Sequence, residues 1–207
     1  MARRAGAPEV SAGSMADIAF LLLIFFLVTT TIETDAGLDR MLPPMEPPTE
    51  EPPIIKQKNI FTVNINRNGQ LLVEDEILSI NDLRAKAIEF LDNGGAPSGS
   101  PDYCSYCKGK RNPESSDNPT KAIISLKNDR ETKYSTYITV QNELVGAYND
   151  LRNREAKRLY GTDYVAMEAE YLNPETTDDK KEELKEKVTR IQGLFPQKLS
   201  EAETSTE

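Results

Sequence analysis

Apolar residues form one long stretch near the start of the chain and only short periodic stretches after it. Residues 10–32 contain a single charged side chain, Asp17, and their most apolar part runs from Ile18 to Val28. As an α-helix, a segment of this length extends about 34 Å and crosses a hydrocarbon core of roughly 30 Å. The pattern therefore predicts a single N-terminal transmembrane helix over residues 10–32.

Charged residues on either side of this segment predict its orientation. Arg3 and Arg4 precede it, and a group of acidic residues that begins with Glu33 follows it. Basic flanks stay in the cytoplasm by the positive-inside rule. We therefore expect residues 1–9 in the cytoplasm and residues 33–207 on the far side of the membrane.

A cleaved signal peptide is the alternative interpretation of the same segment. The arginine pair and the short apolar core are typical of one. Residues 29–35, however, offer no clear small-x-small cleavage site, and Asp17 at the head of the apolar core would hinder insertion. These features favour an anchor that stays attached.

A proline-rich linker is predicted directly after the anchor, over residues 33–58. Six prolines lie between Leu42 and Pro53, and such a run favours an extended, semi-rigid spacer. The spacer is either a passive tether or a segment that rearranges on activation.

Residues 59–161 carry patterns that predict a small α+β domain. Alternation over residues 60–65, the turn signal at 66–69 and the apolar run 70–73 predict a β-hairpin. A helix, a strand and a second helix follow, which gives the order β-β-α-β-α, a small α/β sandwich with helices against one sheet. These later elements are a helix capped by Ser79 and ending before Gly94-Gly95, a strand over 122–126 and a helix over about 135–158.

Residues 92–120 are rich in Gly, Pro, Ser and Asn and predict a long loop that contains Cys104 and Cys107. Outside the cytoplasm the compartment is oxidising, so we expect a local disulfide. A redox-active thiol pair is one alternative, although no helix N-terminus that would lower a thiol pKa is evident. Half a zinc site is another, although the sequence has no His and no second cysteine pair.

The rest of the chain is acidic, which restricts its partners and chemistry. The net charge is -9, and residues 1–32 contribute none of it, so we expect no nucleic-acid partner. Without His, and without a Ser/His/Asp set or a phosphate loop, we expect a partner-binding protein with no cofactor rather than an enzyme. Residues 162–207 are expected to form an acidic tail, helical over 178–192 and disordered over 200–207.

Asp17 is the candidate for chemistry within the predicted membrane segment. A central Asp costs about 2.5–3.5 kcal/mol on insertion scales, and hydrocarbon favours the neutral form of a carboxyl group. A group that gains a proton on one side and loses it on the other converts membrane potential into work. The alternative is that Asp17 only caps the helix. On a helix, Asp17 shares one face with Gly13, Ser14, Phe20, Leu21 and Ile24. The small residues of this face, Gly13 and Ser14, favour packing against a partner helix.

The run from Ser14 to Val28 resembles the transmembrane signature of the ExbD/TolR biopolymer-transport family, approximately P-M-x-D-x-x-F-x-L-L-I-F-F-x-V. Ser14 replaces the usual Pro. A weaker resemblance continues around Tyr134, Tyr137 and Val140, and loop 92–120 looks like an insertion into the shorter family pattern. The matching positions are Met15, Asp17, Phe20, Leu22, Leu23, Ile24, Phe25, Phe26 and Val28.

The resemblance implies a mechanism and a set of partners. Family members insert their helix, as two copies, into a pentameric ExbB/TolQ-like ring of the bacterial inner membrane. The Asp that corresponds to Asp17 carries protons, the coupling ion, and their flow energises a TonB-like protein for transport across the outer membrane. The resemblance thus implies a proton-motive-force-coupled motor subunit with a periplasmic domain.

Three other functions are open at this point. A TolR-like envelope-integrity subunit fits the same signature, whereas the peptidoglycan-binding signature of the related MotB stator proteins is not evident. A non-energetic periplasmic scaffold would need the helix only as an anchor. A membrane-tethered thiol protein would depend on Cys104 and Cys107.

Overall fold

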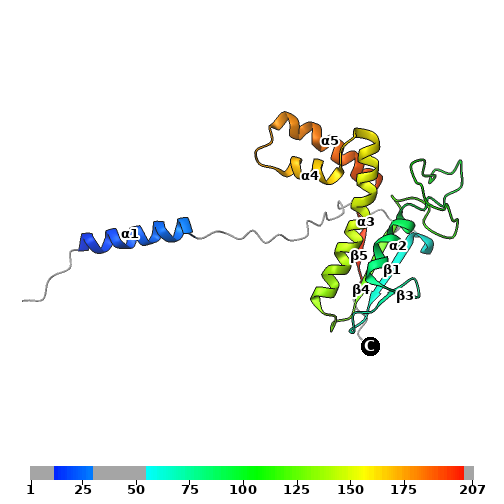
Figure 1. Cartoon of the computed structure of the whole chain (residues 1–207), viewed down its shortest axis with the longest axis horizontal. Helices are drawn as coiled ribbons and strands as arrows, with labels where there is room; N and C mark the ends of the chain where they lie inside the picture. Colours follow the sequence, from blue (N-terminus) through cyan, green and yellow to red (C-terminus); the bar gives the residue numbers. More distant parts are fainter. Residues whose placement is uncertain (1–11, 30–54, 203–207) are drawn as a thin grey trace, which may run out of the picture. The chain divides into compact units, whose positions relative to one another are not determined.

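The computed structural model describes residues 12–29 and 55–202. The chain divides into two compact units, residues 1–44 and 45–207, which are described separately (Figure 1). The first unit contributes helix α1, Ala12–Thr29. The second contains the short 3-10 helix η1 (Gln57–Asn59), strands β1 (Ile60–Ile65), β2 (Leu71–Val73), β3 (Glu76–Leu78), β4 (Ile123–Asn128) and β5 (Leu199–Glu201), and helices α2 (Ile80–Leu91), α3 (Tyr134–Tyr160), α4 (Tyr164–Leu172) and α5 (Asp178–Leu194).

Helix α1 forms within the predicted membrane segment. Its residues from Ile18 to Val28 are uniformly apolar and contain neither Gly nor Pro, so nothing in that run interrupts the helix. Within residues 12–29 and 55–202, no helix has the length and apolarity needed to cross a membrane. Residues 10, 11 and 30–32 of the predicted span lie outside the described residues.

The second unit is a mixed α+β domain built on one five-stranded sheet. The strand order is β3-β2-β1-β4-β5. Strand β1 pairs antiparallel with β2 and parallel with β4, and β4 pairs parallel with β5. The predicted turn between β1 and β2 is confirmed, because the amide of Gly69 donates to the Asn66 carbonyl at 2.9 Å.

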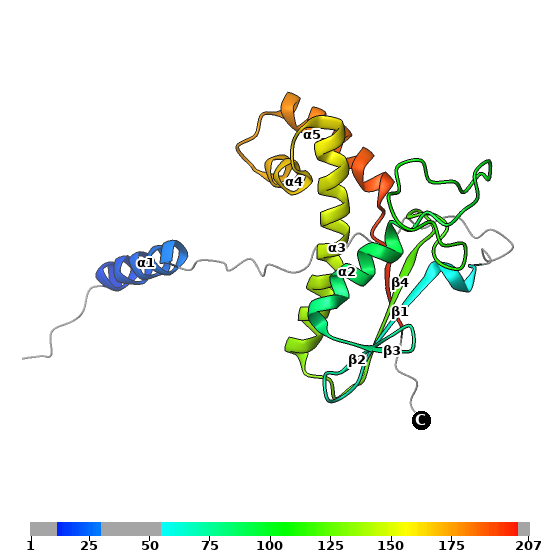
Figure 2. The same cartoon turned by 45° about the vertical axis from the view of Figure 1, so that its right-hand side comes forward.

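Helices α2 and α3 lie on one face of the sheet and bury its alternate side chains (Figure 2). Ser79 caps α2 as predicted, since its hydroxyl accepts from the Asn81 amide. The resulting core contains Phe61, Val63, Ile65, Leu71, Val73, Leu83, Ala87, Phe90, Leu91, Ile124, Leu126, Val140, Leu144, Ala147, Tyr148 and Leu151.

The sheet has two strands that the sequence pattern did not predict. Strand β3 follows β2 through a two-residue turn in which Glu74 and Asp75 both adopt positive φ, at 46° and 70°. Such turns usually contain Asn or Gly, so their sequence signal is absent here. Strands β3 and β5 have three residues each, which is too short for alternation to be recognised.

Residues 162–207 were predicted to form an acidic, partly helical tail outside the domain. The helix predicted over 178–192 is confirmed as α5, but the region is folded into the domain. Helices α4 and α5 pack on the C-terminal part of α3 around a second core, which includes Tyr164, Met167 and Ile191. The chain then returns to the main core through the fully buried Phe195 and forms β5 at the sheet edge. Ser200 and Glu201, which were expected to be disordered, belong to that strand.

Candidate functional site

Asp17 lies in the second turn of α1, and the apolar run follows it directly. Residues 13, 17, 20, 21 and 24 share one face at helical spacing and span about 16 Å along the axis. Asp17 is exposed, and so are Phe20 (61%), Leu21 (58%) and Ile24 (41%). The side chain of Ser14, the remaining predicted packing residue, lies outside the described part.

No described residue forms an ion pair or a hydrogen bond with the Asp17 carboxylate. The apolar side chains on the other faces of α1 are also exposed, with Leu23 62% and Phe25 59% exposed. A carboxylate in apolar surroundings needs a partner, water or a proton. The structure therefore presents a helix whose surface is suited to enclosure by another apolar component.

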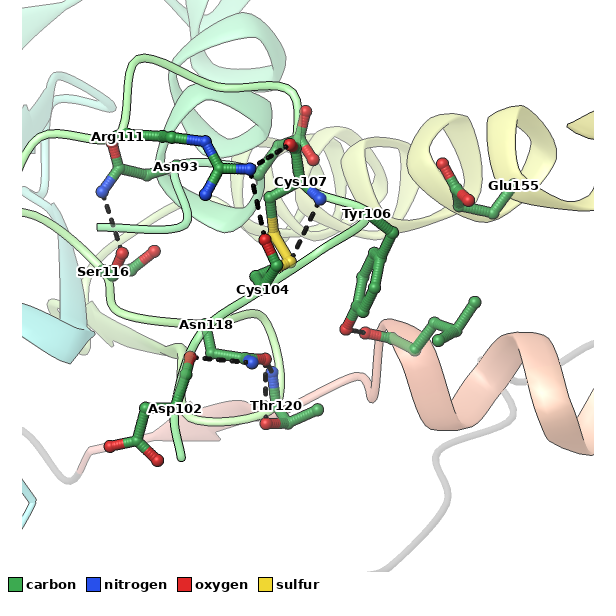
Figure 3. Close-up of a disulfide and its surroundings, with 12 residues drawn as sticks. Asn93, Asp102, Cys104, Tyr106, Cys107, Arg111, Ser116, Asn118, Thr120 and Glu155 are labelled. Atoms are coloured by element: carbon green, nitrogen blue, oxygen red, sulfur yellow. Dashed lines mark hydrogen bonds between the residues drawn. A yellow bond between two sulfur atoms is a disulfide. The ribbon is translucent and has the colours of Figure 1, made fainter. Parts of the chain in front are cut away.

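In the second unit, Cys104 and Cys107 form a disulfide within the loop of residues 93–122, here called the cysteine loop. Both cysteines are buried, at 1% and 5% exposure. Arg111 Nη2 donates to the carbonyl oxygens of Cys104 and Cys107 at 3.2 and 3.1 Å (Figure 3). The disulfide is therefore integrated into an ordered loop.

The base of the cysteine loop is fixed by buried amide hydrogen bonds. The Asn93 side chain donates to the carbonyls of Asn112 and Ser116 at 2.9 and 2.8 Å, and its Oδ1 accepts from the Asn112 amide. The Gly95 backbone lies so close to the Asn112 backbone that a Cβ atom added at position 95 would fall 2.2 Å from the Asn112 carbonyl oxygen. The loop is irregular in backbone but held by specific contacts at its base.

Asp117 joins the same loop to the residues that precede β1. Lys58 Nζ lies 2.5 Å from Asp117 Oδ1, Lys56 Nζ lies 3.4 Å from Oδ2, and the Asn59 amide group donates to Oδ2. Burial alone would raise the pKa of the Asp117 carboxyl, but Lys58, Asn59 and Lys56 together lower the pKa below its ordinary value. The carboxylate is therefore held in its ionised form.

A second charged network joins α2 to α3. Arg154 makes a two-pronged contact with Asp92, at 2.6 and 2.8 Å, and a third with Glu155 at 3.2 Å. The hydrogen bond with Asp92 is the main reason that the pKa of Arg154 is raised. The fully buried Glu155 also accepts from Arg158 at 2.7 Å. These paired charges position helices and offer no unsatisfied group for catalysis.

Two residues that tie the C-terminal region to the domain were missed at the sequence level. Tyr106, inside the disulfide ring, donates its hydroxyl to the Leu194 carbonyl at 2.7 Å (Figure 3). Arg152 donates to the Phe195 carbonyl through Nε and Nη2, at 3.0 and 2.9 Å. The positions of these residues in helical and loop patterns gave no signal of contacts so distant in sequence.

The described residues contain no group of three or more His, Cys, Asp or Glu side chains arranged to hold a metal ion. A comparison with curated proteins finds no match. The family model for Biopolymer transport protein ExbD/TolR matches residues 3–152, which is most of the chain and includes α1, the linker, the sheet up to β4 and much of α3. The chain belongs to the ExbD/TolR family of biopolymer transport proteins.

Proposed function

We propose that this protein is a bacterial inner-membrane subunit that couples the proton-motive force to transport, with Asp17 as the proton carrier. The observation that carries the proposal is the isolated carboxyl group at the head of an apolar helix. Family membership supports it, because the matched region includes this helix. The coupling ion is the proton, and no cofactor is required.

The proposal places α1 and its flanking residues, over 10–32, across the inner membrane. Exposed apolar side chains surround α1, and soluble proteins rarely present such a surface to water. The arginines at positions 3 and 4 favour a cytoplasmic N-terminus. The α+β domain is then periplasmic, where its disulfide is stable.

A single helix with one carboxyl group cannot form a proton path, so the proposal requires partner helices. An ExbB/TolQ-like pentameric ring would enclose two copies of α1, with Gly13 allowing close approach of a neighbouring helix. Residues 10–32 contain no second charge to complete the path. The ring must therefore supply the remaining polar groups, and the periplasmic domain would act on a TonB-like protein.

Replacement of Asp17 by Asn tests this function, because it keeps the side chain's size and removes its proton. We expect Asp17→Asn to co-purify with the ring protein at the wild-type level while energised uptake across the outer membrane falls to the level of a deletion strain. The matched variant Asp17→Glu keeps a titratable group and should retain part of the uptake.

Normal uptake by Asp17→Asn would contradict the proton role and favour a scaffold. If the deletion strain has normal uptake but a defect in envelope integrity, the protein has a TolR-like function instead. Replacing Cys104 and Cys107 by Ser should leave some uptake, whereas the thiol-protein alternative requires its complete loss.

A further inference from the structure

The cysteine loop contacts the C-terminal region through Tyr106. The Tyr106 ring packs edge-on against the buried Phe195 ring, with centroids 5.5 Å apart. Its hydroxyl donates to the Leu194 carbonyl, a residue 88 positions away in sequence. Burial, together with the negative charges of Glu155 and Asp92, raises the pKa of Tyr106 to about 12. The hydroxyl thus stays protonated as a donor.

The position of Tyr106 depends on the disulfide. Tyr106 lies inside the four-residue ring that Cys104 and Cys107 close, and the Cys107 amide donates to Cys104 Sγ within that ring. The cysteine loop contains neither helix nor strand. When the ring opens, the backbone and side chain of Tyr106 regain rotational freedom, and the contact with Phe195 must then be formed at a higher entropic cost.

The residues that Tyr106 holds lead directly into the edge strand. After Phe195, the Lys198 carbonyl accepts from the Ile124 amide at 2.9 Å, and β5 begins at Leu199. The Lys198 ammonium group donates to the Thr120 carbonyl, which also belongs to the cysteine loop. Because β5 has only three residues and pairs with β4 alone among the strands, these anchors contribute to its place on the sheet. Arg152, which donates to the Phe195 carbonyl, and Gln141, which donates to Glu201, hold the same segment from α3.

We propose that the Cys104–Cys107 disulfide is a redox-sensitive clamp that keeps residues 194–202, here called the C-terminal strap, on the sheet edge. In the oxidised state Tyr106 holds the strap through Leu194 and Phe195. In the reduced state the strap detaches more often. This device acts independently of Asp17, so it does not rest on the proposed proton coupling.

The switching chemistry is a thiol–disulfide exchange with a dithiol reductant. One thiolate of the reductant attacks a cysteine sulfur, the Cys104–Cys107 bond breaks, and a mixed disulfide forms. The second thiol of the reductant then attacks the mixed disulfide and displaces the cysteine bound in it. The products are two protein thiols and a reductant oxidised to its disulfide. Since both sulfurs are buried, the loop must open locally before attack. The clamp is thus stable in an oxidising compartment and opens when a dithiol reductant reaches it.

Hydrogen–deuterium exchange on the full-length chain in detergent, before and after treatment with dithiothreitol, tests the clamp. Thiol alkylation verifies the redox state. We expect amides of the strap to exchange about tenfold faster after reduction, the change expected when one hydrogen bond and one ring contact are lost. Amides of β1 and α2 should keep their rates.

Two variants separate the clamp from general stability. Tyr106→Ala, with the disulfide intact, should raise strap exchange to the reduced wild-type rate, and reduction should then add nothing. Ser105→Ala, in the same ring but exposed, should leave every rate unchanged. Equal strap exchange in the oxidised and reduced protein would overturn the proposal, and so would acceleration of all segments alike.

Discussion

At the residue scale, Asp117 shows how a buried charge is kept in this domain. Its side chain is nearly inaccessible and contacts Lys56, Lys58 and Asn59 at once. A buried carboxylate with these partners is stable, but the loss of its charge leaves two lysines without their common acceptor. The ionised Asp117 carboxylate therefore adds two ion pairs to the connection between the cysteine loop and the residues before β1, where the Asp117 backbone amide also donates to Asn59 Oδ1 at 2.8 Å.

Asp117→Asn should lower the free energy of unfolding by about 1–3 kcal/mol at neutral pH, the range for losing a charged hydrogen-bonded partner. Because the pKa of Asp117 is lowered in the folded state, its stabilisation is complete above the ordinary Asp pKa of about 3.9 and is lost as the pH falls through the folded value. Urea unfolding of both proteins at neutral pH and below about pH 3 checks this. A stability difference that stays constant across this range would contradict the ionised assignment.

At the element scale, long patterns were predictable from the sequence and short ones were not. The hairpin turn, the Ser79 cap and the helices corresponding to α2, α3 and α5 follow from alternation, capping and helical spacing. Strands β3 and β5 were missed because three residues carry no period, and the β2–β3 turn uses Glu74 and Asp75. The role of the C-terminal region was missed because Tyr106, Arg152 and Phe195 act through contacts far apart in sequence.

Phe195→Ala tests whether the C-terminal region is part of the fold rather than a tail. Phe195 is fully buried in the main core, so its truncation should cost about 3–5 kcal/mol, as for other buried aromatic residues. Leu172→Ala, at an apolar position of α4 that is 62% exposed, should change stability by less than about 0.5 kcal/mol. Thermal or urea unfolding measures both. A Phe195→Ala effect as small as that of Leu172→Ala would show that residues 195–202 are dispensable.

At the scale of the whole molecule, the charge is unevenly distributed along the sequence. Residues 1–32 have no net charge and contain α1 with Asp17, whereas the remaining residues carry the whole net charge of -9. The candidate site was predictable, because one carboxyl group in an apolar run is visible in the sequence itself. The polar groups that the proposed function requires around Asp17 were not predictable, because the proposal assigns them to another protein. The proposed function therefore depends on whether Asp17 carries protons when α1 is enclosed.

Proton flux through the reconstituted complex tests that dependence most directly. The wild-type chain, Asp17→Asn and Asp17→Glu would each be reconstituted with the co-purified ring protein in lipid vesicles that contain a pH-sensitive dye. Under an imposed potential, we predict proton entry with wild-type protein and entry at the rate of empty vesicles with Asp17→Asn, although both complexes contain the same amount of ring protein. Proton entry with Asp17→Asn equal to that of the wild type would contradict the central claim.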